Sequence, residues 1–140
     1  MRSCPAPANS AAMTILTAEP ADPTGYGRIF RKMANGRETD EVERIVEQKA
    51  LQGDQGEQRE INSGIYAFAT APLYAQIGKL TTDNAHGEYY LTDAVSVLFS
   101  AGYRVQSLVL PDSMEAAGVN DRAQLAVAEA ELRDRINERW

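Results

Sequence analysis

The chain has 140 residues, which is the length of one ordinary domain with a buried core. Apolar residues make up 44% of it and charged residues 24%, as in globular proteins that fold in water. The formal net charge of −6 argues against broad electrostatic capture of nucleic acid or of an anionic membrane, because neither phosphate-rich surface attracts an acidic protein.

The first ten residues, MRSCPAPANS, form a polar, proline-rich head. The head contains the only cysteine, Cys4, so no intramolecular disulfide can form and a reducing compartment is indicated. It has no apolar stretch like that of a signal peptide, and no run of the chain approaches the length of a membrane span. We therefore expect a cytoplasmic protein that has neither a membrane nor a nucleic acid as its partner.

Strands dominate the first half of the chain. The apolar run at residues 13–18 (MTILTA) predicts a buried strand. Residues 26–32 and 42–49 predict the two strands of a hairpin that turns at Asn35 and Gly36, with the polar segment GRETDE exposed between them. Residues 61–69 (INSGIYAFA) alternate apolar and small side chains, as expected for a further strand.

Helices dominate the second half. Residues 72–80 predict a short helix opened by Pro72, and residues 93–101 a helix that is capped by Thr92 and ended by Gly102. A strand is predicted at residues 104–110. A long helix at residues 122–139 carries an apolar stripe formed by Leu125, Ala128, Leu132 and Ile136. The order of these elements indicates a mixed α/β fold, and the hairpin argues against an all-parallel sheet.

The segment ADPTGYGRIF, at residues 21–30, places Gly25 and Gly27 around a stiff aromatic side chain. Glycine permits unusual backbone angles and close approach of another group to the main chain. The segment is therefore either a loop that opens the hairpin or a backbone cradle for a nucleotide or a sugar phosphate.

Two polar positions on the predicted strands have both a structural and a functional interpretation. On a strand, Glu47 and Lys49 point to one face, where they could grip a phosphosugar, although a solvated face with offsetting charges is the commoner arrangement. Asn62 lies within an apolar strand, so it either satisfies backbone groups or faces a ligand.

Two loops near the predicted helices also carry polar groups. The segment HGEYYLTD contains the single histidine, His86, without a second metal ligand at useful spacing, and Asp93 fits the first turn of a helix. In GVNDR, Asn120 or Asp121 is an expected helix cap, and an amide oxygen beside a carboxylate also suits magnesium.

The segments DPTGYGRI, IVEQK, EINSGIY, NAHGEYYLTD and GVNDR, in this order and at these spacings, resemble one family. It is the uridyltransferase domain of the bacterial bifunctional enzyme that acetylates glucosamine 1-phosphate and then uridylylates the product, the GlmU enzymes. The resemblance runs from about residue 11 to the C-terminus. It implies part of a Rossmann-like nucleotide-diphospho-sugar transferase domain with a mixed sheet and a β-hairpin.

The resemblance also implies roles for individual residues. Gly27 matches a glycine whose backbone contacts UDP-N-acetylglucosamine, and Glu47 and Asn62 match groups that bind its N-acetylglucosamine part. Asn120 matches a residue that contacts the nucleotide sugar and is one of two protein ligands of the catalytic Mg²⁺. Glu88, Tyr90 and Thr92 match residues in the wall of the family's sugar pocket. Lys49 matches a phosphate-binding lysine of the wider sugar-nucleotidyltransferase group.

The chain departs from the family pattern in what it lacks. It has no glycine-rich loop of the L-A-A-G-x-G-T-R-M kind for the triphosphate, no second magnesium ligand and no left-handed β-helix for acetyl transfer.

We therefore expect a head at residues 1–10 and the C-terminal half of a uridyltransferase domain at residues 11–140, ending in the helix that leads to the absent β-helix. This half should bind the sugar and be inactive alone. We also expect it to form a homo-oligomer or to complement an N-terminal half. The alternatives are a non-catalytic module that binds a sugar nucleotide or a partner, and an incomplete gene product.

Overall fold

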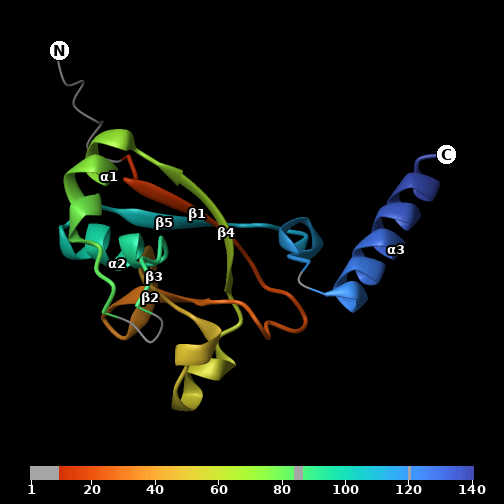
Figure 1. The fold of residues 1–140 in the computed structure, drawn as a ribbon, viewed down its shortest axis with the longest axis horizontal. Coiled ribbons are helices and arrows are strands. Elements are labelled where there is room, and N and C mark those ends of the chain that lie inside the picture. The colour runs from red at the N-terminus through yellow and green to blue at the C-terminus, as the bar shows by residue number, and fades with distance from the viewer. Residues whose placement is uncertain (1–9, 84–86, 120) are drawn as a thin grey trace.

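The computed structural model describes residues 10–83, 87–119 and 121–140. Its α-helices and strands follow one another in the predicted order (Figure 1). Their bounds are β1 Met13–Ala18, β2 Arg28–Ala34, β3 Arg37–Val46, β4 Ile61–Phe68, α1 Thr70–Gln76, α2 Asp93–Ser100, β5 Val105–Val109 and α3 Arg122–Glu138. The mixed α/β class predicted from the sequence is confirmed.

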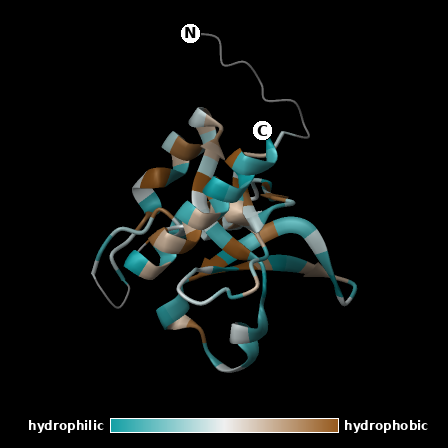
Figure 2. Ribbon diagram, turned by 90° about the vertical axis from the view of Figure 1, so that its right-hand side faces the viewer, coloured by the Kyte–Doolittle hydropathy of each residue, from teal (hydrophilic) through white to brown (hydrophobic). Residues whose placement is uncertain are grey.

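Strand β1 lies at the centre of the fold, because it pairs antiparallel with β4 and parallel with β5. Met13 and Ile15 are fully buried, while Thr14 and Leu16, which follow them in turn, are half-buried. This alternation places every second side chain of β1 in the core. Figure 2 shows hydrophobic and hydrophilic residues following one another along the strands, as expected where one face of each strand is buried.

The hairpin β2–β3 turns at Asn35 and Gly36, as predicted. Both residues have positive φ, 52° and 74°, which is the backbone of a two-residue hairpin turn. Because the turn is this tight, Ala34 already pairs with Arg37. The segment GRETDE, expected to connect the two strands, therefore lies largely within β3, where it is mostly exposed as predicted. Strand β3 ends at Val46, earlier than predicted.

The strands close into a ring in the order β1, β4, β2, β3, β5. One residue pair, Arg28 with Ile61, joins β2 to β4, and another, Glu41 with Gln106, joins β3 to β5. The register of the hairpin shifts on both sides of Arg31, and such bulges bend a strand pair. The bent hairpin can thus reach both edges of the sheet, so the expected mixed sheet is also closed.

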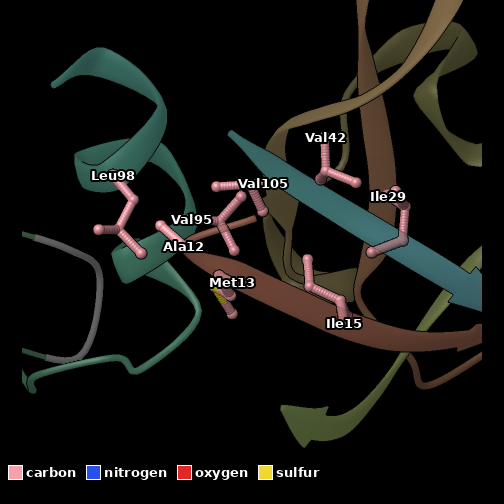
Figure 3. Packing of buried hydrophobic residues seen from close by; sticks show 8 residues of the cluster. All are labelled: Ala12, Met13, Ile15, Ile29, Val42, Val95, Leu98 and Val105. Carbon is pink, nitrogen blue, oxygen red and sulfur yellow. The ribbon is translucent and has the colours of Figure 1, made fainter. Parts of the chain in front are cut away.

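The main core lies between this ring and α2 (Figure 3). Val95 and Leu98 of α2 are buried there, and Phe99 of the same helix is half-buried. Burying each such side chain stabilises the fold by about 1.5–3 kcal/mol. The cluster consists of Ala12, Met13, Ile15, Ile29, Val42, Val95, Leu98 and Val105.

Helix α3 extends away from the ring, at the right of Figure 1, and none of its residues is buried. Its predicted apolar stripe is accordingly open to solvent: the exposed fractions are 56% for Leu125, 59% for Leu132 and 48% for Ile136. Asp121 caps the helix by accepting a hydrogen bond from the Gln124 N–H, 2.8 Å away. The helix is therefore formed as predicted, but none of the described residues covers its apolar stripe.

Candidate functional site

Gly27 and Glu47 lie side by side at the open end of the β2–β3 hairpin. Gly27 precedes β2 and Glu47 follows β3, and the pairing of Arg28 with Val46 places them opposite each other. A Cβ atom added at residue 27 would lie 3.4 Å from the carboxylate oxygen Oε2 of Glu47 and 3.0 Å from Cγ2 of Ile45. Any side chain at residue 27 would therefore press on this part of the site.

Asn62, on β4, joins this pair from the neighbouring strand. Its backbone N–H donates to the carbonyl oxygen of Gly27 over 2.9 Å. Its side-chain oxygen Oδ1 accepts from the Gly64 N–H at 3.1 Å, and its Nδ2 donates to the Tyr66 hydroxyl at 2.8 Å. The amide thus satisfies a backbone group, which was one of its two interpretations. Each of its polar atoms still has capacity for a second hydrogen bond.

A cavity of about 670 Å³ opens beside Glu47. Four of the predicted site residues line it: Glu47, Lys49, Tyr90 and Thr92. The other lining residues are Gly25, Ile45, Val46, Gln48, Ala50 and Asp93. Apolar walls with a few convergent polar groups suit a molecule such as a sugar phosphate, which has both apolar faces and hydroxyls.

The loop before β2 contributes to this cavity through Gly25. Its backbone N–H donates to Oε1 of Gln48 over 3.2 Å, which ties the loop to the segment after β3. The loop that contains Gly25 therefore opens the hairpin, which was the simpler of its two interpretations, and it also lies against the cavity. Gly27 and Asn62 do not line the cavity; Gly27 lies beside Glu47, and Asn62 is bonded to Gly27.

Lys49 reaches the cavity in a different way from that predicted. Strand β3 ends at Val46, and residues Gln48–Ala50 form a short 3-10 helix. The prediction that Glu47 and Lys49 share one face of a strand is therefore wrong. No ion pair within 4 Å joins Glu47 to Lys49, so the two charges do not offset each other by direct contact. The 3-10 turn nevertheless keeps both side chains on one cavity.

The electrostatic environment links Glu47 to two tyrosines. Burial raises the pKa of the Tyr66 hydroxyl, the hydrogen bond from Asn62 lowers it, and the charge of Glu47 raises it again, with a net increase. The pKa of Tyr90 is raised by burial and then by the charges of Glu88, Glu47 and Asp93. Both phenols therefore stay protonated at neutral pH and can donate hydrogen bonds.

Asp93 lies in the first turn of α2, as predicted, and also faces the cavity. Burial raises its pKa, since removing a carboxylate from water disfavours its charged form. Thr92 precedes the helix without forming a side-chain capping hydrogen bond. Its hydroxyl is thus not used by the helix. Glu88 does not line the cavity, and its part in the site is its charge near Tyr90.

The described residues do not provide a ligand set for magnesium. Asn120, the predicted magnesium ligand, and His86 lie outside the described residues. Within residues 10–83, 87–119 and 121–140, no group of three or more His, Cys, Asp or Glu side chains is placed to hold a metal ion. The described part of the chain therefore does not fit Mg²⁺ by itself.

Sequence reasoning missed Tyr66 and Gln48. Tyr66 follows Asn62 by four residues, a separation of about 13 Å in a regular strand, so strand alternation alone does not predict their contact. The contact depends on the irregularity around Gly64, which has a φ of 80° and lies where the register between β1 and β4 shifts. Gln48 carried no signal either, because its contact with Gly25 depends on the chain turning immediately after β3.

No helix in the described part of the chain is long and apolar enough to cross a membrane.

Comparison with known proteins gives close relatives of one kind. The bifunctional protein GlmU of Koribacter versatilis is 58% identical over 125 residues, which covers 89% of this chain and 26% of that protein. GlmU of Kineococcus radiotolerans is 50% identical over 129 residues, covering 92% of this chain and 25% of that protein. The chain is a partial homologue of GlmU.

The chain spans about a quarter of the length of these GlmU proteins. GlmU of Streptococcus suis, 49% identical over 126 residues, is covered to the same extent, 26%. No family model matches the chain. Among solved structures, a nucleoside-diphosphate-sugar pyrophosphorylase from Vibrio cholerae RC9 has a TM-score of 0.49 and 10% identity, over 71% of this chain and 39% of that one.

Proposed function

We propose that this chain supplies the sugar-binding part of a uridyltransferase site, in which UTP and N-acetylglucosamine 1-phosphate form UDP-N-acetylglucosamine and pyrophosphate. The observation that carries the proposal is the meeting of Gly27, Glu47 and Asn62, which lie at the ends of three different strands. These are three of the residues that the resemblance assigns to the nucleotide sugar. The homology to GlmU supports the same reaction.

Each of these groups has a chemical role that the geometry permits. The Glu47 carboxylate can accept hydrogen bonds from sugar hydroxyls, and such charge-assisted bonds contribute about 1.5–3 kcal/mol each. The Asn62 amide can donate one bond and accept another. Tyr90 and Thr92 add a ring and a hydroxyl to the cavity wall, and Lys49 adds a cation that can pair with a sugar phosphate.

The reaction itself needs alignment more than covalent chemistry. A phosphate oxygen of N-acetylglucosamine 1-phosphate forms a bond to the α-phosphorus of UTP, and the bond from that phosphorus to the pyrophosphate oxygen breaks. In this proposal the present chain fixes the sugar, and hence the attacking oxygen, in position. Residues 11–140 then correspond to the C-terminal half of the uridyltransferase domain. The open stripe of α3 supports a further packing partner for that helix.

Calorimetric titration of the 140-residue chain with UDP-N-acetylglucosamine tests the proposal. Glu47→Ala and Asn62→Ala should each weaken binding, because each removes polar contacts worth about 1–3 kcal/mol. Two controls match them: Glu38→Ala, on the same hairpin but near its turn, and Asn137→Ala, on the exposed end of α3.

Unchanged affinity in both site variants would contradict the assignment of these residues. Addition of the missing half, followed by both this titration and a pyrophosphate-release assay, distinguishes an enzyme from a module. Restored turnover supports a split enzyme, whereas binding without turnover supports a non-catalytic sugar-nucleotide module.

A further inference from the structure

The side-chain amide of Asn62 is held at both ends by its own strand. Oδ1 accepts from the Gly64 N–H over 3.1 Å, and Nδ2 donates to the Tyr66 hydroxyl over 2.8 Å. Rotating the amide by half a turn would set its NH₂ group against the Gly64 N–H, which is also a donor. The Gly64 contact therefore selects which end of the amide faces the backbone, and the Tyr66 hydroxyl restrains the other end in place.

Tyr66 is itself fixed from the side of the core. Its ring packs against the main buried cluster and lies 6.0 Å from the ring of Phe68, measured between centroids. In the sheet it pairs with Ile15, a fully buried residue of β1. The hydroxyl that receives the Asn62 N–H is thus carried by a ring that packs against the core.

Only one hydrogen of Nδ2 is engaged with Tyr66, and only one lone pair of Oδ1 is engaged with Gly64. An amide with a fixed orientation presents its remaining donor and acceptor at fixed positions. An amide free to rotate would instead present either group at either position and would lose orientational freedom on binding. A fixed amide is therefore the better receptor for a polar ligand.

We propose that Tyr66 is a positioning residue, which orients the Asn62 amide for recognition of an N-acetylated sugar. This inference rests on the proposed function, because it requires that Asn62 contacts the sugar. It assigns to Tyr66 a task that its ring alone would not perform, namely that of a hydrogen-bond acceptor for the amide.

The test replaces Tyr66 by phenylalanine, which keeps the ring in the core and removes the hydroxyl. UDP-N-acetylglucosamine binding to the 140-residue chain should weaken about two- to twelve-fold, the equivalent of one ordinary hydrogen bond. Tyr103→Phe is the matched control: Tyr103 packs against the same cluster, and its hydroxyl takes part in no hydrogen bond within the described residues. It should bind as the wild type does.

The double variant Tyr66→Phe/Asn62→Ala separates positioning from a direct contact. If Tyr66 acts through Asn62, the phenylalanine change should cause no further loss once the amide is gone. A loss of equal size in both backgrounds would overturn the proposal, because Tyr66 would then act independently of Asn62.

A second readout does not depend on the ligand. In ¹⁵N-correlated spectra, the Asn62 NH₂ pair should shift and lose order in Tyr66→Phe and stay unchanged in Tyr103→Phe. An ordered, unshifted amide in Tyr66→Phe overturns the proposal whatever the titrations show. If Asn62→Ala binds as tightly as the wild type, the proposed sugar contact fails, and the proposal that Tyr66 orients Asn62 for the sugar fails with it.

Discussion

The guanidinium of Arg31 forms a two-pronged ion pair with the carboxylate of Glu60. Nε of Arg31 lies 2.9 Å from Oε2 and Nη2 lies 2.7 Å from Oε1. Glu60 also accepts from the Thr17 hydroxyl at 2.7 Å, and Nη2 of Arg31 donates to the Ser107 hydroxyl at 2.6 Å. One buried cluster thereby ties β2 to β1, to β5 and to the residue that precedes β4.

This ion pair should be a large local contributor to stability. Glu60→Ala should lower the free energy of unfolding by about 3–5 kcal/mol, because it leaves the Arg31 guanidinium, whose side chain is only 17% exposed, without its charged partner. Urea denaturation measures the change. Glu41→Ala, which removes the exposed pair with Lys32, is the control and should cost about 0–1 kcal/mol. Equal losses in the two variants would contradict the assigned importance of the cluster.

Gly27→Ala should weaken sugar-nucleotide binding while the fold is retained. The added methyl group would lie 3.0 Å from Ile45 and 3.4 Å from the Glu47 carboxylate, so these side chains must move. Overpacking of this kind typically costs about 1–3 kcal/mol. Calorimetric titration measures the binding, and Gly56→Ala is the control, because a Cβ atom there would meet nothing within 4 Å. Wild-type affinity in Gly27→Ala would show that the close approach to Glu47 has no role in binding.

The stability difference between the wild type and Asp93→Asn should depend on pH. Burial raises the pKa of Asp93 above its ordinary value of 3.8, so the folded state disfavours the charged form. The wild type therefore loses stability relative to the variant as pH rises through the folded pKa, and this penalty is absent below about pH 3.8. Asp93→Asn should accordingly gain most at neutral pH. Thermal melts of both proteins from about pH 7 to about pH 4 measure the difference. A difference that grows toward low pH would contradict the sign.

The isolated chain should self-associate, because its α3 stripe is exposed. Apolar groups in contact with water favour association that covers them. Light scattering at micromolar concentration should show species larger than a monomer, and Leu132→Glu should shift them toward the monomer. Asp134→Asn, an exposed change on the same helix, should leave the distribution as it is. A compact wild-type monomer across this range would refute the prediction.

The 140-residue chain should not turn over UTP and N-acetylglucosamine 1-phosphate. The residues that the resemblance assigns to triphosphate binding are not in its sequence, and without them the attacking and leaving oxygens are not aligned. A coupled pyrophosphate-release assay measures turnover. Magnesium-dependent activity that is lost in Asn120→Ala would show that the chain has a complete site.

The elements of this fold could be predicted where their causes are local. Residues 13–18 form a strand at the predicted bounds, because a β-rich apolar run is ended there by Glu19 and Pro20. Asn35 and Gly36 turn the hairpin, because their own backbone preferences suit positive φ. Val95 and Leu98 face the core, because their spacing places them on one side of a helix. The resemblance also indicated Gly27, Glu47 and Asn62 together.

Contacts between distant segments needed the tertiary structure. Closure of the sheet depends on the bend in the hairpin around Arg31, and the placement of Lys49 depends on β3 ending at Val46. Neither follows from local propensity. The sequence predicted the apolar stripe of α3 but not its exposure, because periodicity shows which side of a helix is apolar and not whether another segment covers it. Burial is a property of pairs of surfaces, and only the packed chain determines which surfaces meet.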